Sequence, residues 1–184
     1  MTNAKPTKAT EGLPGGLPEA EQALAALLDK MRGAVAMDAK FIGIYSGGAW
    51  LAERLATLVP GEHPVGFIDV SFYRDDYGQK GLRAKVKTTT LPFEVEGSRI
   101  VLIDDVLYTG RSVRAAINEI FDYGRPEKIE LAVLVDRGGR ELPIEATYVG
   151  ARVTVARELS IVLNRAAADR FELSVEPATS GPRA

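Results

Sequence analysis

Two adjacent carboxylates at the end of an apolar run are the residues of this sequence best suited to chemistry. Asp104 and Asp105 follow the run Arg99–Ile103, and Thr109 and Gly110 come shortly after them. A continuous apolar run of this kind is typical of a strand buried on both faces of a parallel sheet. Apolar residues then recur at helical spacing, at Val113, Ala116, Ile117 and Ile120. Residues 104–112 are therefore predicted to form a loop between a strand and a helix.

The start of that helix is predicted to bind an anion. Unpaired backbone N–H groups and the positive end of the helix dipole meet near Thr109 and Gly110, which suits a phosphate. Thr109 and Ser112 add hydroxyl donors, and glycine allows close backbone approach. Asp104 and Asp105 repel a phosphate, so they must bind neutral hydroxyl groups or a metal. A ligand that carries both a phosphate and a diol is a ribose phosphate.

The elements that must position these residues follow from hydrophobic periodicity. We predict a helix from Pro18 to about Met37, a strand over 41–45, a helix over 49–58 and further strands over 65–73, 99–103 and 128–136. The alternation predicts an α/β fold with an open, mostly parallel twisted sheet and helices on both faces. A polar loop at 74–81 predicts an additional β-hairpin. Ligands bind at the carboxyl ends of such sheets, where 45–48, 104–112 and 136–140 should converge.

Composition sets the outer limits. The chain has 184 residues and a formal net charge of −2, so the whole molecule does not attract nucleic acid, although a local basic patch remains possible. It lacks cysteine, which fits a reducing, cytoplasmic location, and its only histidine is His63, which argues against His-based triads. No apolar run has the length of a membrane span. We expect a disordered extension over 1–16, one domain over 17–175 and a tail over 176–184.

The residues carry a family resemblance. The stretch "VLIDDVLYTGRS" (101–112) resembles the phosphoribosyl-pyrophosphate (PRPP) motif of type I phosphoribosyltransferases. The segments "SFYRDD" (71–76), "DYGRP" (122–126) and "LAVLVDRGGRELP" (131–143) are similar to the PyrR family. Members of that family combine uracil phosphoribosyltransferase activity with attenuation of pyrimidine-biosynthesis transcripts. The resemblance covers roughly residues 18–165 and implies the type I phosphoribosyltransferase fold.

The resemblance implies a role for each matching residue. Asp104 and Asp105 are expected to hold the ribose hydroxyls, and Arg74, in a flexible loop, is expected to close over the site as a third catalytic residue. Asp136 and Arg137 are expected to contact the base or nucleotide. The expected 5′-phosphate cradle comprises Val106, Leu107, Tyr108, Thr109, Gly110, Arg111 and Ser112. The expected pyrophosphate loop comprises Tyr45, Ser46, Gly47 and Gly48.

Two positions depart from the family pattern. Gly47 stands where the family usually has an arginine. The absence of that arginine removes a cation from the pyrophosphate site and argues for a lower catalytic rate. Glycine pairs such as this one also serve tight turns that need positive φ. Gly139 stands where the family often has a histidine, which questions RNA binding.

The resemblance also implies partners. Mg²⁺ is expected to arrive with PRPP, and uracil, UMP or UTP are the expected small molecules. A homo-oligomer, a dimer, is expected. Arg83, Lys85 and Lys87 share one face of a predicted strand and are candidate contacts for pyrimidine-operon leader RNA, although such charges also keep an exposed strand soluble. Two alternatives stay open: a regulator with little catalysis, and a phosphoribosyltransferase for another base.

Overall fold

The computed structural model describes residues 16–70 and 88–178. Its helices are α1 (Ala20–Met31), α2 (Gly47–Leu58), α3 (Arg111–Tyr123) and the short 3₁₀ helix η4 (Ala167–Asp169). Its strands are β1 (Lys40–Ile44), β2 (Val65–Ile68), β3 (Arg99–Leu107), β4 (Lys128–Asp136), β5 (Tyr148–Arg152), β6 (Leu159–Arg165) and β7 (Phe171–Pro177). Among these described residues, no helix has the length and apolar character needed to cross a bilayer.

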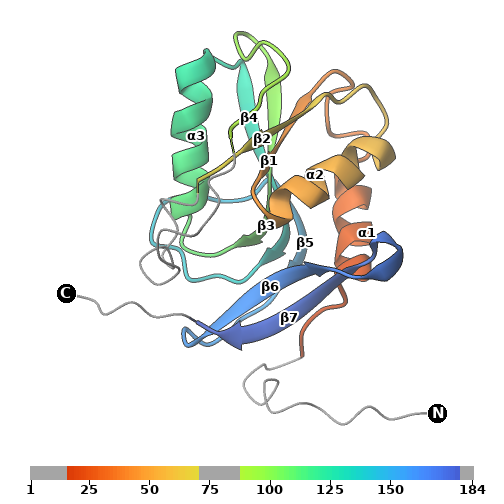
Figure 1. Cartoon of the computed structure of the whole chain (residues 1–184), viewed down its shortest axis with the longest axis vertical. Helices are drawn as coiled ribbons and strands as arrows, with labels where there is room; N and C mark the ends of the chain where they lie inside the picture. Colours follow the sequence, from red (N-terminus) through yellow and green to blue (C-terminus); the bar gives the residue numbers. More distant parts are fainter. Residues whose placement is uncertain (1–15, 71–87, 179–184) are drawn as a thin grey trace.

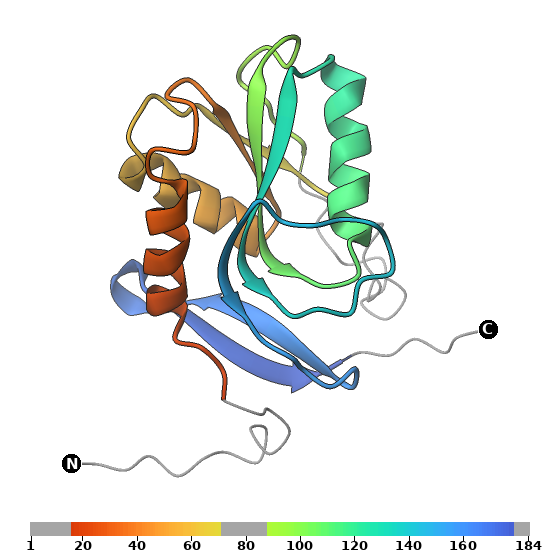
Figure 2. The ribbon, with the colours of Figure 1, turned by 180° about the vertical axis from the view of Figure 1, so that it is seen from behind.

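Five strands form one parallel sheet in the order β2-β1-β3-β4-β5. Helix α2 connects β1 to β2 and α3 connects β3 to β4, so the carboxyl ends of the strands meet at one edge (Figures 1 and 2). The central strand β3 pairs with β1 only as far as Ile103, but with β4 as far as Leu107. The carboxyl end of β3 therefore extends beyond its neighbour β1.

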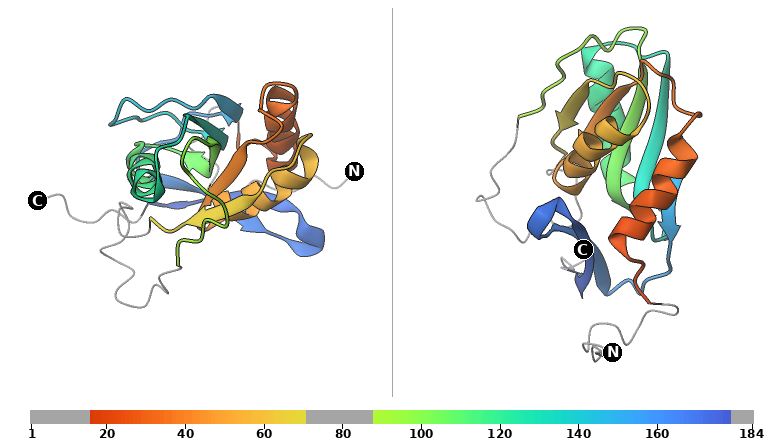
Figure 3. Two further views of the ribbon diagram at one scale, coloured as in Figure 1. Left: turned by 90° about the horizontal axis from the view of Figure 1, so that it is seen from above. Right: turned by 90° about the vertical axis from the view of Figure 1, so that its right-hand side faces the viewer.

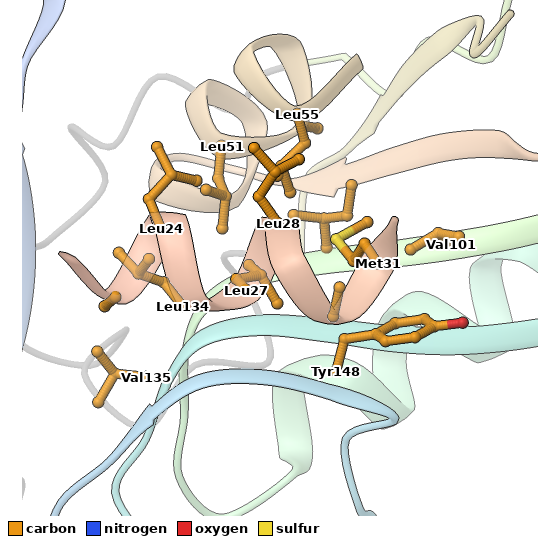
Figure 4. Packing of buried hydrophobic residues seen from close by; sticks show 14 of the residues in the cluster. Leu24, Leu27, Leu28, Met31, Leu51, Leu55, Val101, Leu134, Val135 and Tyr148 are labelled. Atoms are coloured by element: carbon orange, nitrogen blue, oxygen red, sulfur yellow. The ribbon is translucent and has the colours of Figure 1, made fainter. Parts of the chain in front are cut away.

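Helices cover both faces of the sheet, as predicted. Helices α1 and α2 lie on one face and α3 lies on the other (Figure 3). Leu27 and Met31 of α1 are fully buried and pack near Leu51 and Leu55 of α2 over the sheet (Figure 4). On the opposite face, Ile120 belongs to the apolar stripe that α3 lays on the sheet.

A second, antiparallel sheet consists of the hairpin β6–β7, which lies by the carboxyl edge of the parallel sheet (Figure 1). Arg54 of α2 donates two hydrogen bonds to the Glu21 carboxylate of α1, at 2.8 and 2.7 Å. The same carboxylate accepts a bond from the Phe171 backbone N–H at 2.7 Å, and the Arg54 guanidinium lies 5.0 Å from the Phe171 ring centroid. Both helices therefore hold the start of β7.

Several predicted boundaries were wrong. Helix α1 ends at Met31, six residues early, because the chain turns at Gly33 with φ of +73°. The strand predicted over 99–103 continues through Leu107, because β4 pairs with its whole length. Glu176 and Pro177, predicted as tail, belong to β7. The predicted hairpin around 74–81 and residues 1–15 of the predicted extension over 1–16 lie outside the described residues.

Candidate functional site

The two aspartates lie on β3 itself, not in the loop that was predicted. Asp104 is 4% exposed and Asp105 is 9% exposed, and both follow the last residue of β3 that pairs with β1. Successive side chains of a strand point to opposite faces of a sheet. The Asp104 carboxylate accepts a hydrogen bond from the Asp105 N–H at 3.1 Å. The pair thus presents carboxylates on both sides of the overhanging end of β3.

The predicted phosphate seat is the start of α3. Gly110 occupies the N-cap position with φ of +91°, a conformation that glycine adopts without the penalty other residues incur. In the part of the chain that is described, no side-chain N-cap bond and no acidic first-turn residue occupy this helix start. Thr109 is buried, and its hydroxyl accepts a bond from the Arg111 N–H at 3.4 Å. The helix start therefore presents backbone donors, as an anion site needs.

Residues 141–144, to which the sequence analysis gave no role, contact the start of α3 and support it. The Thr109 carbonyl accepts bonds from the N–H groups of Glu141 and Leu142 at 3.0 and 3.1 Å. Glu141 also pairs with Arg111 at 2.6 Å. A Cβ atom on Gly110 would lie 3.1 Å from Ile144. The only signal for this support was that 141–143 falls within the stretch resembling the PyrR family.

Glycine is needed at position 47 because a side chain there would collide with Asp105, not because the backbone has a positive φ. It begins α2, and its φ is not among the positive ones. A Cβ atom at this position would lie 2.5 Å from Cγ and 2.9 Å from Cβ of Asp105. A Cβ atom on Gly48 would meet the β3 backbone, at 3.2 Å from the Ile103 carbonyl carbon and 3.0 Å from the Asp104 Cα. The start of α2 therefore packs directly against the β3 carboxylate, and the positive-φ explanation is wrong.

The segment 136–140 wraps around the β3 end, as the convergence of carboxyl edges predicted. Arg140 donates to the Tyr108 carbonyl at 2.8 Å and pairs with Asp136 at 2.7 Å. Asp136 is 8% exposed and also accepts a bond from the Gly138 N–H at 3.0 Å. The Arg137 N–H donates to the Leu107 carbonyl at 3.1 Å. These contacts bring the predicted base residues beside the predicted phosphate cradle.

Arg137 is turned into the protein. It is 5% exposed, and its terminal nitrogens donate to the carbonyls of Leu159 (2.7 Å), Ala156 (3.0 Å) and Val155 (3.4 Å). Its guanidinium carbon lies 4.0 Å from the centroid of the Tyr108 ring. Burial lowers the pKa of this guanidinium, and Tyr108 shifts it in the opposite direction. A base or nucleotide contact by Arg137 stays a prediction, and these contacts indicate a different use of the side chain.

Other predicted residues fall as follows. Tyr45 and Ser46 connect β1 to α2 through a cis peptide bond, and the Tyr45 ring lies 5.4 Å from that of Phe67. Val106 and Leu107 belong to β3, and Ser112 lies in the first turn of α3. The predicted catalytic Arg74 and the candidate RNA contacts Arg83, Lys85 and Lys87 lie outside the described residues.

Comparison with known proteins agrees with this geometry. Residues 17–162 match the model of the phosphoribosyl transferase domain. The chain is 53% identical over 160 residues to the Bifunctional protein PyrR of Ralstonia nicotianae, which covers 85% of this chain and 91% of the relative. This chain belongs to the PyrR family of phosphoribosyltransferases. A PyrR of Pseudomonas fluorescens is 47% identical over 136 residues, covering 74% of this chain and 81% of the relative.

Solved structures show that this chain shares the phosphoribosyltransferase fold. A hypoxanthine-guanine phosphoribosyltransferase from Bacillus anthracis matches with a TM-score of 0.61 and 17% identity, over 80% of this chain and 86% of that chain. The enzyme of Leishmania tarentolae, solved in complex with GMP, matches with a TM-score of 0.57 and 17% identity, over 76% and 81%. The predicted fold class is thereby confirmed.

Proposed function

We propose that this protein transfers the phosphoribosyl group of PRPP to uracil, giving UMP and pyrophosphate, and that it also regulates pyrimidine-biosynthesis transcripts by RNA attenuation in response to UMP. The single observation that carries the proposal is the placement of the Asp104–Asp105 pair on the overhanging end of β3, the strand that leads into the Gly110 start of α3. A diol-binding pair beside a phosphate seat suits a ribose 5-phosphate group. Membership in the PyrR family supports uracil as the acceptor.

In this proposal Asp104 and Asp105 accept hydrogen bonds from the two ribose hydroxyls and so orient the ring. The backbone N–H groups at the start of α3 bind the 5′-phosphate. The ribose C1–oxygen bond to pyrophosphate breaks as the bond from C1 to uracil N1 forms, and the N1 proton is released. Mg²⁺ bound with PRPP would offset the negative charge of pyrophosphate, and the carboxylate oxygens of Asp104 and Asp105 would suit such a hard cation.

Catalysis of this kind depends on positioning and on stabilising charge. Removing one transition-state hydrogen-bond donor costs about 2.7–4 kcal/mol in an acyl-transfer enzyme, and the absent cation at Gly47 is comparable in kind. Arg74 is proposed to supply a donor after loop closure, which also excludes water. The lack of a cationic residue at Gly47 is the observation that favours the second candidate function, a UMP-responsive regulator with little catalysis.

The experiment is a PRPP-dependent assay with uracil, orotate, hypoxanthine and guanine side by side. We expect pyrophosphate release with uracil alone. Release with a purine and not with uracil would contradict the proposed base, and PRPP binding without release for any base would support the regulator.

Variants at the phosphate seat test the site separately from the base. Thr109→Val removes a buried hydroxyl, and Gly110→Val places a branched side chain at φ of +91° against Ile144. Both should weaken PRPP binding in calorimetry by more than tenfold, which corresponds to ~1.4 kcal/mol. Unchanged affinity in both variants would contradict the phosphate seat.

A further inference from the structure

The Tyr108 ring lies in the middle of the proposed phosphate segment and is held by the loop after β4. The Arg137 guanidinium covers one face of the ring, with its carbon 4.0 Å from the centroid. Gly139 lies at the Cδ2–Cε2 edge of the same ring, so closely that a Cβ atom there would be 3.0 Å from Cδ2. Arg140 holds the backbone carbonyl of Tyr108 at 2.8 Å. Three contacts from one short loop therefore hold Tyr108 in place.

Arg137 also reaches a third part of the chain. Its terminal nitrogens donate to the carbonyls of Val155, Ala156 and Leu159, which belong to the segment that leads into β6. Leu159 is the first residue of β6 in the hairpin beside the carboxyl edge (Figure 1). One buried guanidinium therefore joins the end of β4, the phosphate segment and the hairpin.

We propose that Arg137 is a positioning residue that holds Tyr108, and through it the phosphate loop 108–112, in fixed register with the β6–β7 hairpin. Its part in the reaction, which rests on the proposed function, is to keep the loop in the shape that binds PRPP without touching the base. Both terminal nitrogens of Arg137 donate hydrogen bonds to backbone carbonyls. Its Nε is buried and has no hydrogen-bond partner among the described residues.

The planar, five-donor shape of arginine suits this task. A guanidinium can donate to several carbonyls from its edge while its flat face covers an aromatic ring. A lysine ammonium has a single charged point and cannot do both in the same geometry. Cation–π contacts are strongest when they are shielded from water, so this one favours a single position of the ring.

The hairpin offers a matched control. Arg54 also covers an aromatic ring, that of Phe171, and it also fixes the hairpin, through Glu21. It makes no recorded contact with the phosphate segment among the described residues. Arg137→Met and Arg54→Met therefore both remove a hairpin-holding guanidinium, but only the first removes the cover of Tyr108.

The test compares these two full-length variants with the wild type. PRPP binding is measured by calorimetry, KM and kcat with PRPP and uracil by steady-state assay, and amide hydrogen exchange by mass spectrometry. We expect Arg137→Met to raise the PRPP Kd and KM by about tenfold, the factor that ~1.4 kcal/mol produces, and to speed exchange over 107–112. Arg54→Met should speed exchange over 171–177 and leave PRPP affinity within about twofold. Arg137→Lys should resemble Arg137→Met, because a positive charge alone does not replace the planar set of donors of the guanidinium.

Several outcomes would overturn the proposal. Equal changes of PRPP affinity in both methionine variants would show that Arg137 acts only by holding the hairpin. Unchanged exchange over 107–112 in Arg137→Met would show that Tyr108 does not depend on it. A change in uracil KM alone would restore the direct base contact.

Two further measurements keep the test independent of folding and of the base. Should Arg137→Met not fold, Tyr108→Leu approaches the same contact from the other side and is expected to speed exchange over 155–159; unchanged exchange there would overturn the coupling. A wild type that does not use uracil would contradict the proposed function, but the PRPP affinities and exchange rates would still decide the role of Arg137.

Discussion

At the scale of single residues, glycine is used here to make room for functional groups. Gly47 leaves space for the Asp105 carboxylate, and Gly139 leaves space for the Tyr108 ring. From sequence, both positions were expected to depart from the family pattern through the loss of a functional side chain. The structure shows that the space each glycine leaves is already occupied by a residue of the proposed PRPP site.

Gly47→Arg tests whether that space matters more than the missing cation. We expect lower kcat in Gly47→Arg, because any side chain at this position displaces the Asp105 carboxylate. Gly47→Ala is the matched variant, since it adds the Cβ atom without a charge. Steady-state kinetics with circular dichroism as a folding control measures both. An arginine variant faster than the wild type would instead show that the missing cation limits the rate.

The aspartate pair allows a second prediction at this scale. Asp104→Asn and Asp105→Asn keep the shape of the side chains and remove their charge. We expect each to lower kcat/KM by more than tenfold, ~1.4 kcal/mol, while the melting temperature changes little. Asp105→Asn should lose somewhat more stability, because its carboxylate lies at the positive start of α2, a contact worth about 0.3–1 kcal/mol. A large loss of melting temperature with turnover intact would identify a structural pair.

At the scale of elements, an ion pair ties two helices to the hairpin. The Arg54 hydrogen bond is the main cause that lowers the pKa of Glu21 from its ordinary value of 4.5, and the Phe171 N–H also contributes. A carboxyl with a lowered folded-state pKa stabilises the fold above its unfolded pKa. This stabilisation is lost as the pH falls through the folded pKa.

The pH dependence of unfolding tests this clamp, by which we mean the Glu21 carboxylate bound by Arg54 and the Phe171 N–H. The wild type should lose free energy of unfolding as the pH falls below 4.5, the ordinary pKa of Glu21, and Glu21→Gln should show a shallower loss over the same range. Urea titrations across that range measure the difference. Glu172→Gln, at an exposed position of β7, is the control and should follow the wild type. Identical slopes in Glu21→Gln and wild type would exclude the clamp as a source of acid sensitivity.

The candidate RNA strand allows a further prediction for an element. Arg83, Lys85 and Lys87 lie outside the described residues, so the expectation rests on sequence alone. Alternate residues of a strand lie about 6.5–7 Å apart, which is close to the spacing of successive phosphates. Changing all three to serine should flatten the salt dependence of binding to a pyrimidine-operon leader and leave PRPP affinity unaltered. A wild type that binds no leader RNA at low salt, with or without UMP, would contradict RNA regulation.

At the scale of the whole molecule, stability and chemistry are located at different places. The face covered by α1 and α2 contains fully buried apolar side chains such as Leu27 and Leu51 (Figure 4). The proposed site lies along the carboxyl edge, on β3, the start of α3 and the 136–140 segment. Core truncations on the α1 face should therefore change stability without changing PRPP binding.

Leu27→Ala tests this separation. Leu27 is fully buried, and removing three carbons from such a position costs about 2–5 kcal/mol of unfolding free energy. PRPP KM should stay at the wild-type value wherever the variant is folded. Met37→Ala is the control, because Met37 is 63% exposed, and it should change neither quantity. A raised PRPP KM in Leu27→Ala would show that the core and the site are coupled.

Sequence by itself determined the elements whose patterns are local. The nine residues of β4, 128–136, were predicted to the residue, because a continuous apolar run identifies a strand buried on both faces. The helix starting near Gly110 and the aspartate pair before it were likewise readable from residue type and spacing. Local periodicity and turn chemistry are encoded over a few residues, so no distant partner is needed to infer them.

Only the tertiary structure decided what depends on distant partners. The extension of β3 to Leu107 requires β4 beside it, and the hairpin β6–β7 is anchored by Glu21, which is 150 residues away from Phe171. The roles of Gly47 and Arg137 depend on Asp105 and Tyr108, which no local pattern connects to them. Close approach and side-chain direction are set by packing between elements, and the same residue types at the same spacing are compatible with several such arrangements.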